Sequence, residues 1–411
     1  GMKDAKNNLI QIEITCPASC IRNREEILSL SSSFSSSSSP SSPPRTNNQH
    51  HSHSWRQQLV HGYQNIFPSS SFIHFKDVQF EKGCPIIIYF HGGGMVCGSS
   101  RDGTFILDFF SQLSTKKSLS PLSSSSSSSN SSKGIVVLSV TYRLAPEHPF
   151  PNSIIDCLSA ASCIIERSNT TTVDKEKDND NDSNNIHIAG FSAGGQLATV
   201  VGLECYRRYP GIIKSIVPLD PMLLPHADTL SYHLNSLSSS FCPALFVRWC
   251  WSAYLQLKVE NEVGDDNNDK MINFDNVDEY TQILEKSSWL KPYIKQKEKK
   301  RNTFDNNEST NVNYNSGRAT TTEYGLARLF YPRIDLPKKL NGEKAPVIIV
   351  KTSTADVLRD DGCDLVRALK AAGANVIHFE MVGSHGISSW FGNNNNGMID
   401  TWSTIIWDGV E

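Results

Sequence analysis

The sequence has no long hydrophobic run, no paired cysteine motif and no marked surplus of charge of either sign. The nearest approach to such a run, residues 241–257, is interrupted by Arg248 and falls short of the roughly 20 apolar residues that cross a membrane as a helix. The 10 cysteines include no C-x-x-C pair and have no histidine partners at zinc spacing, so reduced thiols and no metal site are expected. A formal net charge of -3 excludes the basic surplus typical of a nucleic-acid binder.

The N-terminus lacks the basic start and apolar segment of a secretory signal. A cytoplasmic location is therefore expected, in keeping with reduced thiols. Because the chain opens with Gly1-Met2, the possibility of a leader or anchor ahead of it stays open, and so does the possibility of membrane association. No pattern in the sequence indicates an oligomeric state.

Hydrophobic residues make up only 38% of the chain, and much of the shortfall lies in Ser- and Asn-rich tracts. Residues 31–54 are almost pure Ser, Pro, Asn and His, and such a tract cannot bury enough surface to offset its ordering entropy, so disorder is expected there. Comparable tracts at 118–132, 170–185, 265–268 and 302–315 predict surface insertions.

The rest of the chain alternates apolar runs with helical patterns. Continuous apolar runs, typical of strands buried on both faces, occupy 85–90, 135–140, 186–189, 212–217, 347–350 and 376–381. Residues 9–14 predict a further strand exposed on one face, and helices are expected over 104–113, 153–166, 193–208, 361–372 and 398–407. This alternation predicts an α/β fold with a mostly parallel central sheet and helices on both faces.

The alternation breaks between Pro218 and about Leu336, where helical stretches at 241–259 and 280–284 lie among polar tracts. We expect this block to be an inserted helical cap over the C-terminal edge of the sheet. The predicted organisation is an N-terminal part with a strand and the Ser-rich insertion (1–84), a first part of the core (85–221), the cap with low-complexity loops (222–336) and a second part of the core (337–411).

The segment Gly190-Phe191-Ser192-Ala193-Gly194 follows an apolar run and opens a helical pattern. Its two glycines permit a tight turn that lifts the Ser192 hydroxyl clear of the backbone. The N–H of Ala193 at the helix start would face a developing negative charge. The motif predicts a serine nucleophile, although in a Ser-rich chain it could also mark an ordinary strand-to-helix turn.

A second motif, His91-Gly92-Gly93-Gly94, follows the apolar run at 85–90. Gly92, Gly93 and Gly94 let the backbone approach a substrate and point N–H groups at it, so with Ala193 they are the predicted oxyanion hole. A phosphate-binding loop would need a G-x-x-x-x-G-K-[ST] pattern, which is absent. His91 is expected to brace the loop.

Asp356 and His385 come just after the fifth and sixth apolar runs. The acid and base of a hydrolytic triad belong at such positions, because strand ends of a parallel sheet meet at one edge. Asp360 and Asp361 compete with Asp356 but stand where the next helix starts, where they are expected to be N-cap carboxylates. Ser192, Asp356 and His385, in that order, predict an acyl hydrolase.

With these motifs in place, the chain resembles the hormone-sensitive-lipase-like family of α/β-hydrolase esterases, which includes arylacetamide-deacetylase and steryl-deacetylase relatives. The resemblance also rests on YRLAPEHPFP at 142–151 and DVLRDDG at 356–362, and it covers 85–217 and 345–411. It implies an α/β-hydrolase fold, a triad of Ser192, Asp356 and His385, and an oxyanion hole at the N–H groups of Gly93, Gly94 and Ala193. No metal or cofactor is needed.

Two departures stand beside the site: Phe191 replaces an aspartate usual in that family, and Met95 replaces a common aromatic. We predict a serine carboxylic-ester hydrolase that acts through an acyl-enzyme on small-molecule esters, short-acyl or hydrophobic. The aromatic residues Trp249, Trp251 and Tyr254 favour a hydrophobic substrate or merely pack the cap. The alternatives are a non-catalytic small-molecule receptor on the same fold and an inactive homologue degraded by its insertions.

Overall fold

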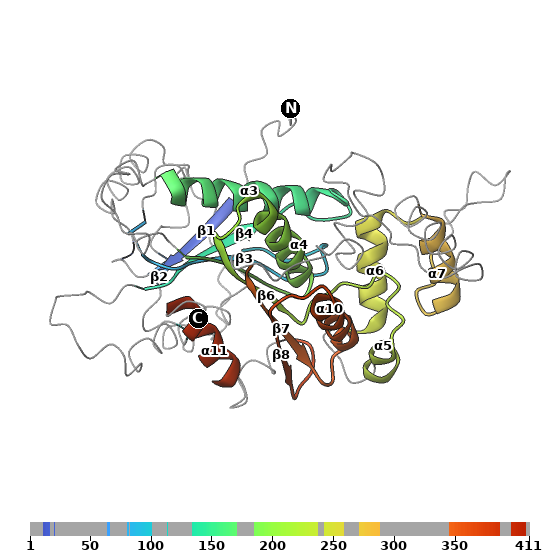
Figure 1. The fold of residues 1–411 in the computed structure, drawn as a ribbon. Helices are drawn as coiled ribbons and strands as arrows, with labels where there is room; N and C mark the ends of the chain where they lie inside the picture. Colours follow the sequence, from blue (N-terminus) through green and yellow to red (C-terminus); the bar gives the residue numbers. More distant parts are fainter. Residues whose placement is uncertain are drawn as a thin grey trace, which may run out of the picture.

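The computed structural model describes residues 11–16, 20, 64–65, 80–81, 83–100, 113, 134–170, 185–236, 242–258, 271–287, 345–386 and 396–407. These residues form one eight-stranded sheet of order β2-β1-β4-β3-β5-β6-β7-β8 (Figure 1). The strands are β1 (Gln11–Cys16), β2 (Gln64–Asn65), β3 (Ile86–Phe90), β4 (Val136–Thr141), β5 (Ile186–Phe191), β6 (Ile213–Leu219), β7 (Val347–Ser353) and β8 (Val376–Met381). Strands β3 to β8 run parallel, whereas β1 is antiparallel to both β4 and β2.

Helices cover both faces of the sheet. The helices α3 (Asn152–Thr170), α4 (Ala193–Arg208) and α10 (Arg359–Ala371) lie on one face, and α11 (Asn396–Trp407) lies on the other (Figure 1). Successive residues of β3 divide between two apolar layers, because side chains alternate across a strand: Ile86 and Ile88 join the layer under α3 and α4, and Ile87 and Tyr89 join the layer under α11. The predicted α/β fold with a mostly parallel sheet is confirmed.

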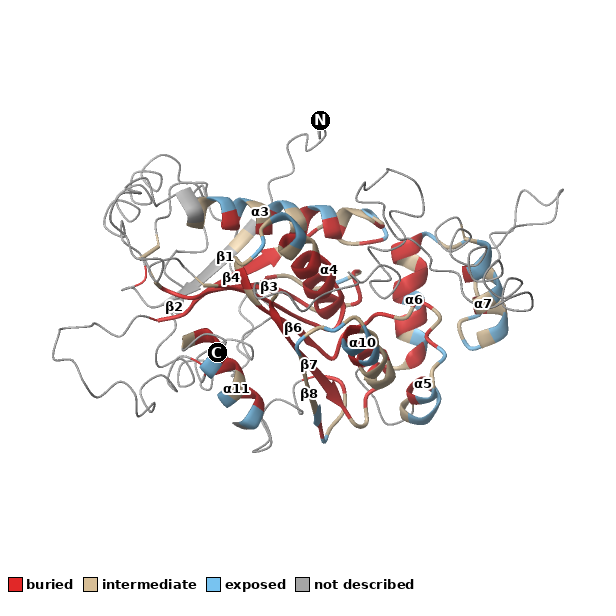
Figure 2. Cartoon of the chain, viewed as in Figure 1, coloured by how far each residue is buried: buried red, intermediate tan, exposed pale blue. Residues whose placement is uncertain are grey.

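Local sequence explains where several helices begin and end. Helix α4 ends at Arg208 with Tyr209 as its C-cap, because the proline that follows Tyr209 disfavours helical backbone in the residue before it. Between β6 and β7 lie three helices, here called the cap helices: α5 (Leu230–Asn235), α6 (Ala244–Leu255) and α7 (Val277–Lys286). In α7 the side chain of Asn276 accepts the N–H of Glu279 and so caps the helix start. Figure 2 shows α4 buried along most of its length, as expected for the central helix.

The segment after β6 packs over the carboxyl ends of the strands. The buried guanidinium of Arg248 in α6 donates to the carbonyl oxygens of Ala227 and Phe274, and Tyr280 of α7 donates to that of Pro225. Helix α6 also touches the core, because the Tyr254 carbonyl accepts the N–H of Phe150. None of the helices in the described part of the chain combines the length and apolarity needed to cross a bilayer.

The observed helices and strands agree with those predicted from the hydrophobic pattern in some regions and differ in others. Helix α4 begins and ends as predicted, and strands β3 to β8 lie within three residues of the expected bounds. The expectation that 376–381 is buried on both faces was wrong: β8 lies at the edge of the sheet, and only Met381 among its residues is buried. The short helix α5 and the two-residue strand β2 were not predicted. The tracts at 31–54, 118–132, 265–268 and 302–315 lie outside the described residues, as do most of 170–185 and all of the expected helix at 104–113 except Leu113.

Candidate active site

Ser192 sits in a strained turn between β5 and α4. Its backbone has φ 58 and ψ -120, in the left-handed half of φ that non-glycine residues rarely adopt. The turn requires two of its glycines: a Cβ on Gly190 would lie 2.0 Å from the Gly194 carbonyl oxygen, and a Cβ on Gly194 would lie 2.0 Å from that of Phe90. Strand β5 and helix α4 therefore approach each other closely, and the tight turn between them holds the Ser192 side chain at the carboxyl end of β5.

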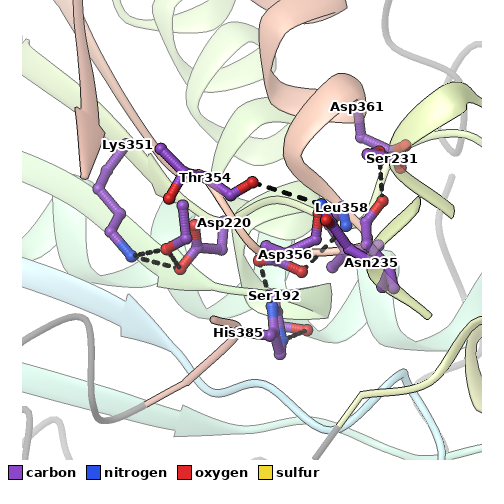
Figure 3. A network of polar contacts seen from close by, with 12 residues as sticks. Ser192, Asp220, Ser231, Asn235, Lys351, Thr354, Asp356, Leu358, Asp361 and His385 are labelled. Carbon is purple, nitrogen blue, oxygen red and sulfur yellow. Dashed lines mark hydrogen bonds and ion pairs between the residues drawn. The ribbon is translucent and has the colours of Figure 1, made fainter. Parts of the chain in front are cut away.

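The structure brings Ser192, Asp356 and His385 together in one hydrogen-bonded chain (Figure 3). His385 Nε2 lies 3.1 Å from Ser192 Oγ, and His385 Nδ1 lies 2.7 Å from Asp356 Oδ2. The three residues follow β5, β7 and β8 respectively, and all are buried. An ionised Asp356 carboxylate can accept hydrogen bonds but cannot donate one, so Nδ1–H of His385 donates to it. Nε2 of His385 is then free of a proton and can accept the hydrogen bond of the Ser192 hydroxyl.

Asp356 is held in place by its own loop and by the cap. Its Oδ1 accepts the N–H of Leu358 at 2.9 Å, and its carbonyl oxygen accepts Nδ2–H of Asn235 at 2.8 Å. Asn235 is the last residue of α5, so this unpredicted helix supports the carboxylate loop directly. The carboxylate has both oxygens engaged, which fixes its orientation toward His385.

The pKa of His385 reflects two opposing effects. Burial lowers the pKa, but the charge of Asp356 and its hydrogen bond to Nδ1 more than offset burial, so the pKa lies above the ordinary histidine value. Asp220 adds to the rise and Lys351 opposes it. The ring of Phe191 stacks on the imidazole, with centroids 4.9 Å apart and planes 27° apart. The residue that departs from the family pattern thus forms an apolar wall of the site.

The glycine loop lies beside Ser192. A Cβ on Gly92 would lie 3.3 Å from Ser192 Cβ, and Gly93 and Gly94 have φ of 108 and 63. His91 stands behind the loop: its Nδ1 lies 2.7 Å from the Gly92 carbonyl oxygen, and its ring stacks on that of Tyr142 at 4.2 Å between centroids. His91 contacts the loop as a brace would.

Ala193 and Met95 complete the surroundings of the loop. Ala193 is the first residue of α4, so its N–H has no acceptor within the helix and lies at the positive end of the helix dipole. Met95 is fully buried and has φ 65. On the cap side, a Cβ on Gly94 would lie 2.2 Å from Cys250 Sγ, so α6 packs directly on the glycine loop.

The expectation that Asp360 and Asp361 are N-cap carboxylates was wrong. Both lie inside the first turn of α10, and their side chains bind N–H groups of another segment. Asp360 Oδ2 accepts the N–H of Ser231, and Asp361 Oδ2 accepts those of Leu223 and Leu224, each at 2.8 Å. Burial raises the pKa of Asp361, and the two backbone N–H groups oppose that rise. The two carboxylates fasten the segment after β6 to α10.

Sequence reasoning missed a second buried carboxylate. Asp220 follows β6, is almost fully buried and forms an ion pair with Lys351 of β7. Ser353 Oγ accepts from Lys351 Nζ at 2.7 Å and donates to Asp220 Oδ2 at 3.2 Å. A signal was present in the sequence, because a lysine directly continues the apolar run of β7 and must find a counter-charge if it stays in the sheet.

One group of potential metal ligands occurs among the described residues. Ligand atoms of Asp220, Asp356 and His385 all lie within 4.8 Å of one another. The Asp220 carboxylate already binds the Lys351 ammonium, and Asp356 bonds to His385 Nδ1. Because the Lys351 ammonium already binds Asp220 and the His385 imidazole points at Ser192, the arrangement favours proton transfer over metal binding.

A protein-family model described as the alpha/beta hydrolase fold matches residues 124–275. Tuliposide A-converting enzyme b1 of Tulipa gesneriana is 30% identical over 144 residues, which are 35% of this chain and 33% of that enzyme. Neutral cholesterol ester hydrolase 1 of Mus musculus is 26% identical over 343 residues, which are 78% of this chain and 72% of that one. The chain has an α/β-hydrolase fold, and it is similar to these two enzymes.

The match to the tulip enzyme spans about a third of that relative's length. Among solved structures, the Pyrobaculum calidifontis esterase aligns over 80% of this chain and 77% of its own chain, with a TM-score of 0.49 and 19% identity. The family match covers the elements from β4 to α6, including the Ser192 turn. Asp356 and His385 lie outside the matched residues.

Proposed function

We propose that this protein is a hydrolase that cleaves carboxylic esters through a covalent acyl-enzyme on Ser192. The observation that carries the proposal is the buried chain of hydrogen bonds from Ser192 Oγ through His385 to Asp356. Such a chain makes a hydroxyl nucleophilic, because the imidazole takes its proton as the oxygen attacks. The mouse relative, named as a cholesterol ester hydrolase, supports an ester as the substrate.

In the first half-reaction, the Ser192 proton moves to His385 Nε2 while Oγ forms a bond to the ester carbonyl carbon. The carbonyl oxygen becomes an oxyanion, and the imidazolium is stabilised by Asp356 at Nδ1. His385 then gives the proton to the alkoxide oxygen as the bond between carbonyl carbon and alkoxide breaks. The alcohol leaves, and the acyl group stays on Ser192.

The oxyanion is assigned to the N–H groups of Gly92, Gly93, Gly94 and Ala193, with Gly93, Gly94 and Ala193 as the main donors. The positive φ of Gly93 and Gly94 and the helix-start position of Ala193 support this role. One such donor typically contributes ~2.7–4 kcal/mol to transition-state stabilisation.

In the second half-reaction, His385 Nε2 takes a proton from water while the water oxygen attacks the acyl carbon. Collapse of the second tetrahedral intermediate returns the proton to Ser192 Oγ and releases the carboxylic acid. The residues of the chain supply every proton transfer in this cycle, so no metal or cofactor enters it.

The substrate is proposed to be a small ester with a short or hydrophobic acyl group. Trp251 and Tyr254 are fully buried, so packing alone accounts for them. The stronger support is Phe191, whose ring covers one face of His385 where the family has a carboxylate. An apolar wall beside the base favours an apolar group on the substrate.

The first experiment is hydrolysis of p-nitrophenyl esters from acetate to palmitate by the wild type and by Ser192→Ala. We expect turnover on short or medium chains and a loss of at least ~10⁴-fold in kcat in the variant. The melting temperature should stay close to the wild-type value, because only a hydroxyl is removed.

Ser159→Ala is the matched control, since Ser159 lies exposed on α3 and bonds only to the Ile155 carbonyl oxygen. Its activity should equal that of the wild type. Turnover by Ser192→Ala at the wild-type rate would refute the acyl-enzyme, and no turnover of any ester by folded wild type would point to the receptor role instead.

A further inference from the structure

A buried ion pair lies between β6 and β7, directly behind the proposed base. Asp220 and Lys351 are each 1% exposed, and the N–H of Asp220 also donates to the Lys351 carbonyl oxygen at 2.9 Å. Asp220 has φ 42, so its backbone is held in the left-handed region. Ser353 bonds to both side chains. The pair is fixed by backbone and side-chain contacts together.

The carboxylate of this pair lies close to the base and to its partner. Ligand atoms of Asp220, Asp356 and His385 are all within 4.8 Å of one another. Figure 3 places Asp220 between Lys351 and Asp356, so the ammonium stands on the side away from Asp356. His385 is therefore near two carboxylates, only one of which bonds to its ring.

A buried ion pair is poor evidence for a purely stabilising role. Desolvating two charges costs several kcal/mol each, and well-packed apolar residues often give equal stability in their place. The position beside His385 therefore calls for another explanation, and the electrostatics of the base provide one.

We propose that Asp220, kept ionised by Lys351, is a positioning residue that stabilises the imidazolium of His385. The proposal rests on the serine mechanism proposed above. Before the reaction, Asp356, Asp220 and Lys351 together carry one net negative charge around a neutral imidazole. When the Ser192 proton reaches Nε2, the new positive charge is balanced without any charged group moving.

Charged groups reach His385 from each strand end packed beside it. They are Asp356 from the loop after β7, Asp220 from the end of β6 and Lys351 from within β7. The charge of Asp356 also raises the pKa of Asp220 and of Asp361. Asp220 raises the pKa of His385 more than Lys351 lowers it. Burial raises the pKa of Asp220 above its ordinary value, and the Lys351 ammonium limits that rise.

The test is the pH dependence of kcat/KM in three variants of the full chain. Asp220→Asn removes the carboxylate, and Asn tolerates the left-handed backbone at this position. The double variant Asp220→Asn with Lys351→Met removes both charges and leaves none unpaired. Ser353→Ala is the control, because it removes the shared hydroxyl and keeps both charges.

The acid limb of the profile should move to lower pH by about one unit in Asp220→Asn and by a smaller amount in the double variant. KM should stay unchanged, because Asp220 does not meet the substrate, and Ser353→Ala should keep the wild-type limb. An acid limb in the double variant that coincides with the wild-type limb overturns the proposal. That variant decides the question even if Asp220→Asn does not fold.

Failure of this inference is separable from failure of the serine mechanism. If Ser192→Ala abolishes turnover while the Asp220 variants keep the wild-type acid limb, the serine mechanism is supported and the ion pair is structural. If Ser192→Ala retains turnover, the serine mechanism is refuted, and the proposed role of Asp220, which depends on it, is refuted too.

Discussion

At the scale of single residues, backbone strain gathers around the proposed site. Among the described non-glycine residues, five have positive φ, and Met95, Ser192 and Asp220 are three of them. Each such residue costs roughly 1–2 kcal/mol unless its surroundings hold it. Met95 follows the glycine loop, Ser192 is the proposed nucleophile and Asp220 lies beside the base. Strain concentrated at these positions is what pre-organised functional sites show.

The raised pKa of His385 predicts a definite pH profile. The base must be neutral to accept the Ser192 proton, so activity is lost as pH falls through the pKa of His385. Because that pKa lies above the ordinary value, the acid limb of kcat/KM should fall above about pH 6.5. A limb well below pH 6.5 would mean that burial outweighs Asp356, contrary to the geometry.

The residues of the proposed site could be predicted unequally from sequence. Ser192 and the glycine loop lie in short motifs whose glycines are needed for close packing, so the local sequence carries the information. Asp220 and Lys351 are 131 positions apart, and they meet only because β6 and β7 pair in one register. No local pattern encodes that register, which is why the ion pair escaped prediction.

At the scale of elements, one short helix links the cap to the carboxylate loop. Helix α5 donates to the Asp356 carbonyl through Asn235, and Ser231 Oγ donates to the Val357 carbonyl at 2.6 Å. The six residues of α5 are too few to show the hydrophobic periodicity that predicts a helix. The bounds of β7 were missed for a related reason, since its last three residues are polar yet buried.

The packing of the Ser192 turn predicts that a single methyl group disrupts it. Gly194→Ala should lower the free energy of unfolding by at least ~3 kcal/mol, because its Cβ would lie 2.0 Å from the Phe90 carbonyl oxygen. Denaturant unfolding measures the change. Gly397→Ala is the matched control: its Cβ would meet nothing closer than 3.8 Å, so a neutral or slightly stabilising change is expected.

At the scale of the whole molecule, the sheet separates two apolar layers. The larger layer lies under α3, α4 and α10. The layer under α11 is smaller, and Trp402 lies within it with its Nε1–H donated to Ser215 Oγ at 3.0 Å. The alternation of apolar runs was sufficient to predict this layered architecture.

Trp402, which packs within the second layer and donates to Ser215, should affect stability without affecting the chemistry. Trp402→Ala should cost about 3–5 kcal/mol of unfolding free energy and leave the acid limb of kcat/KM in place for the folded fraction. Thr404→Ala, on the exposed side of the same helix, is the control and should change neither quantity measurably. A displaced acid limb in Trp402→Ala would show that the two layers are coupled.

The order of the strands along the chain has a consequence for biosynthesis. A growing polypeptide completes the glycine loop and the Ser192 turn long before the ribosome reaches Asp356, and the base at 385 comes later still. Strands β7 and β8 then add to one edge of a sheet already begun. On the proposed mechanism, the nascent chain carries its nucleophile in an inert form, and reactivity arises only when the last parallel strand has docked.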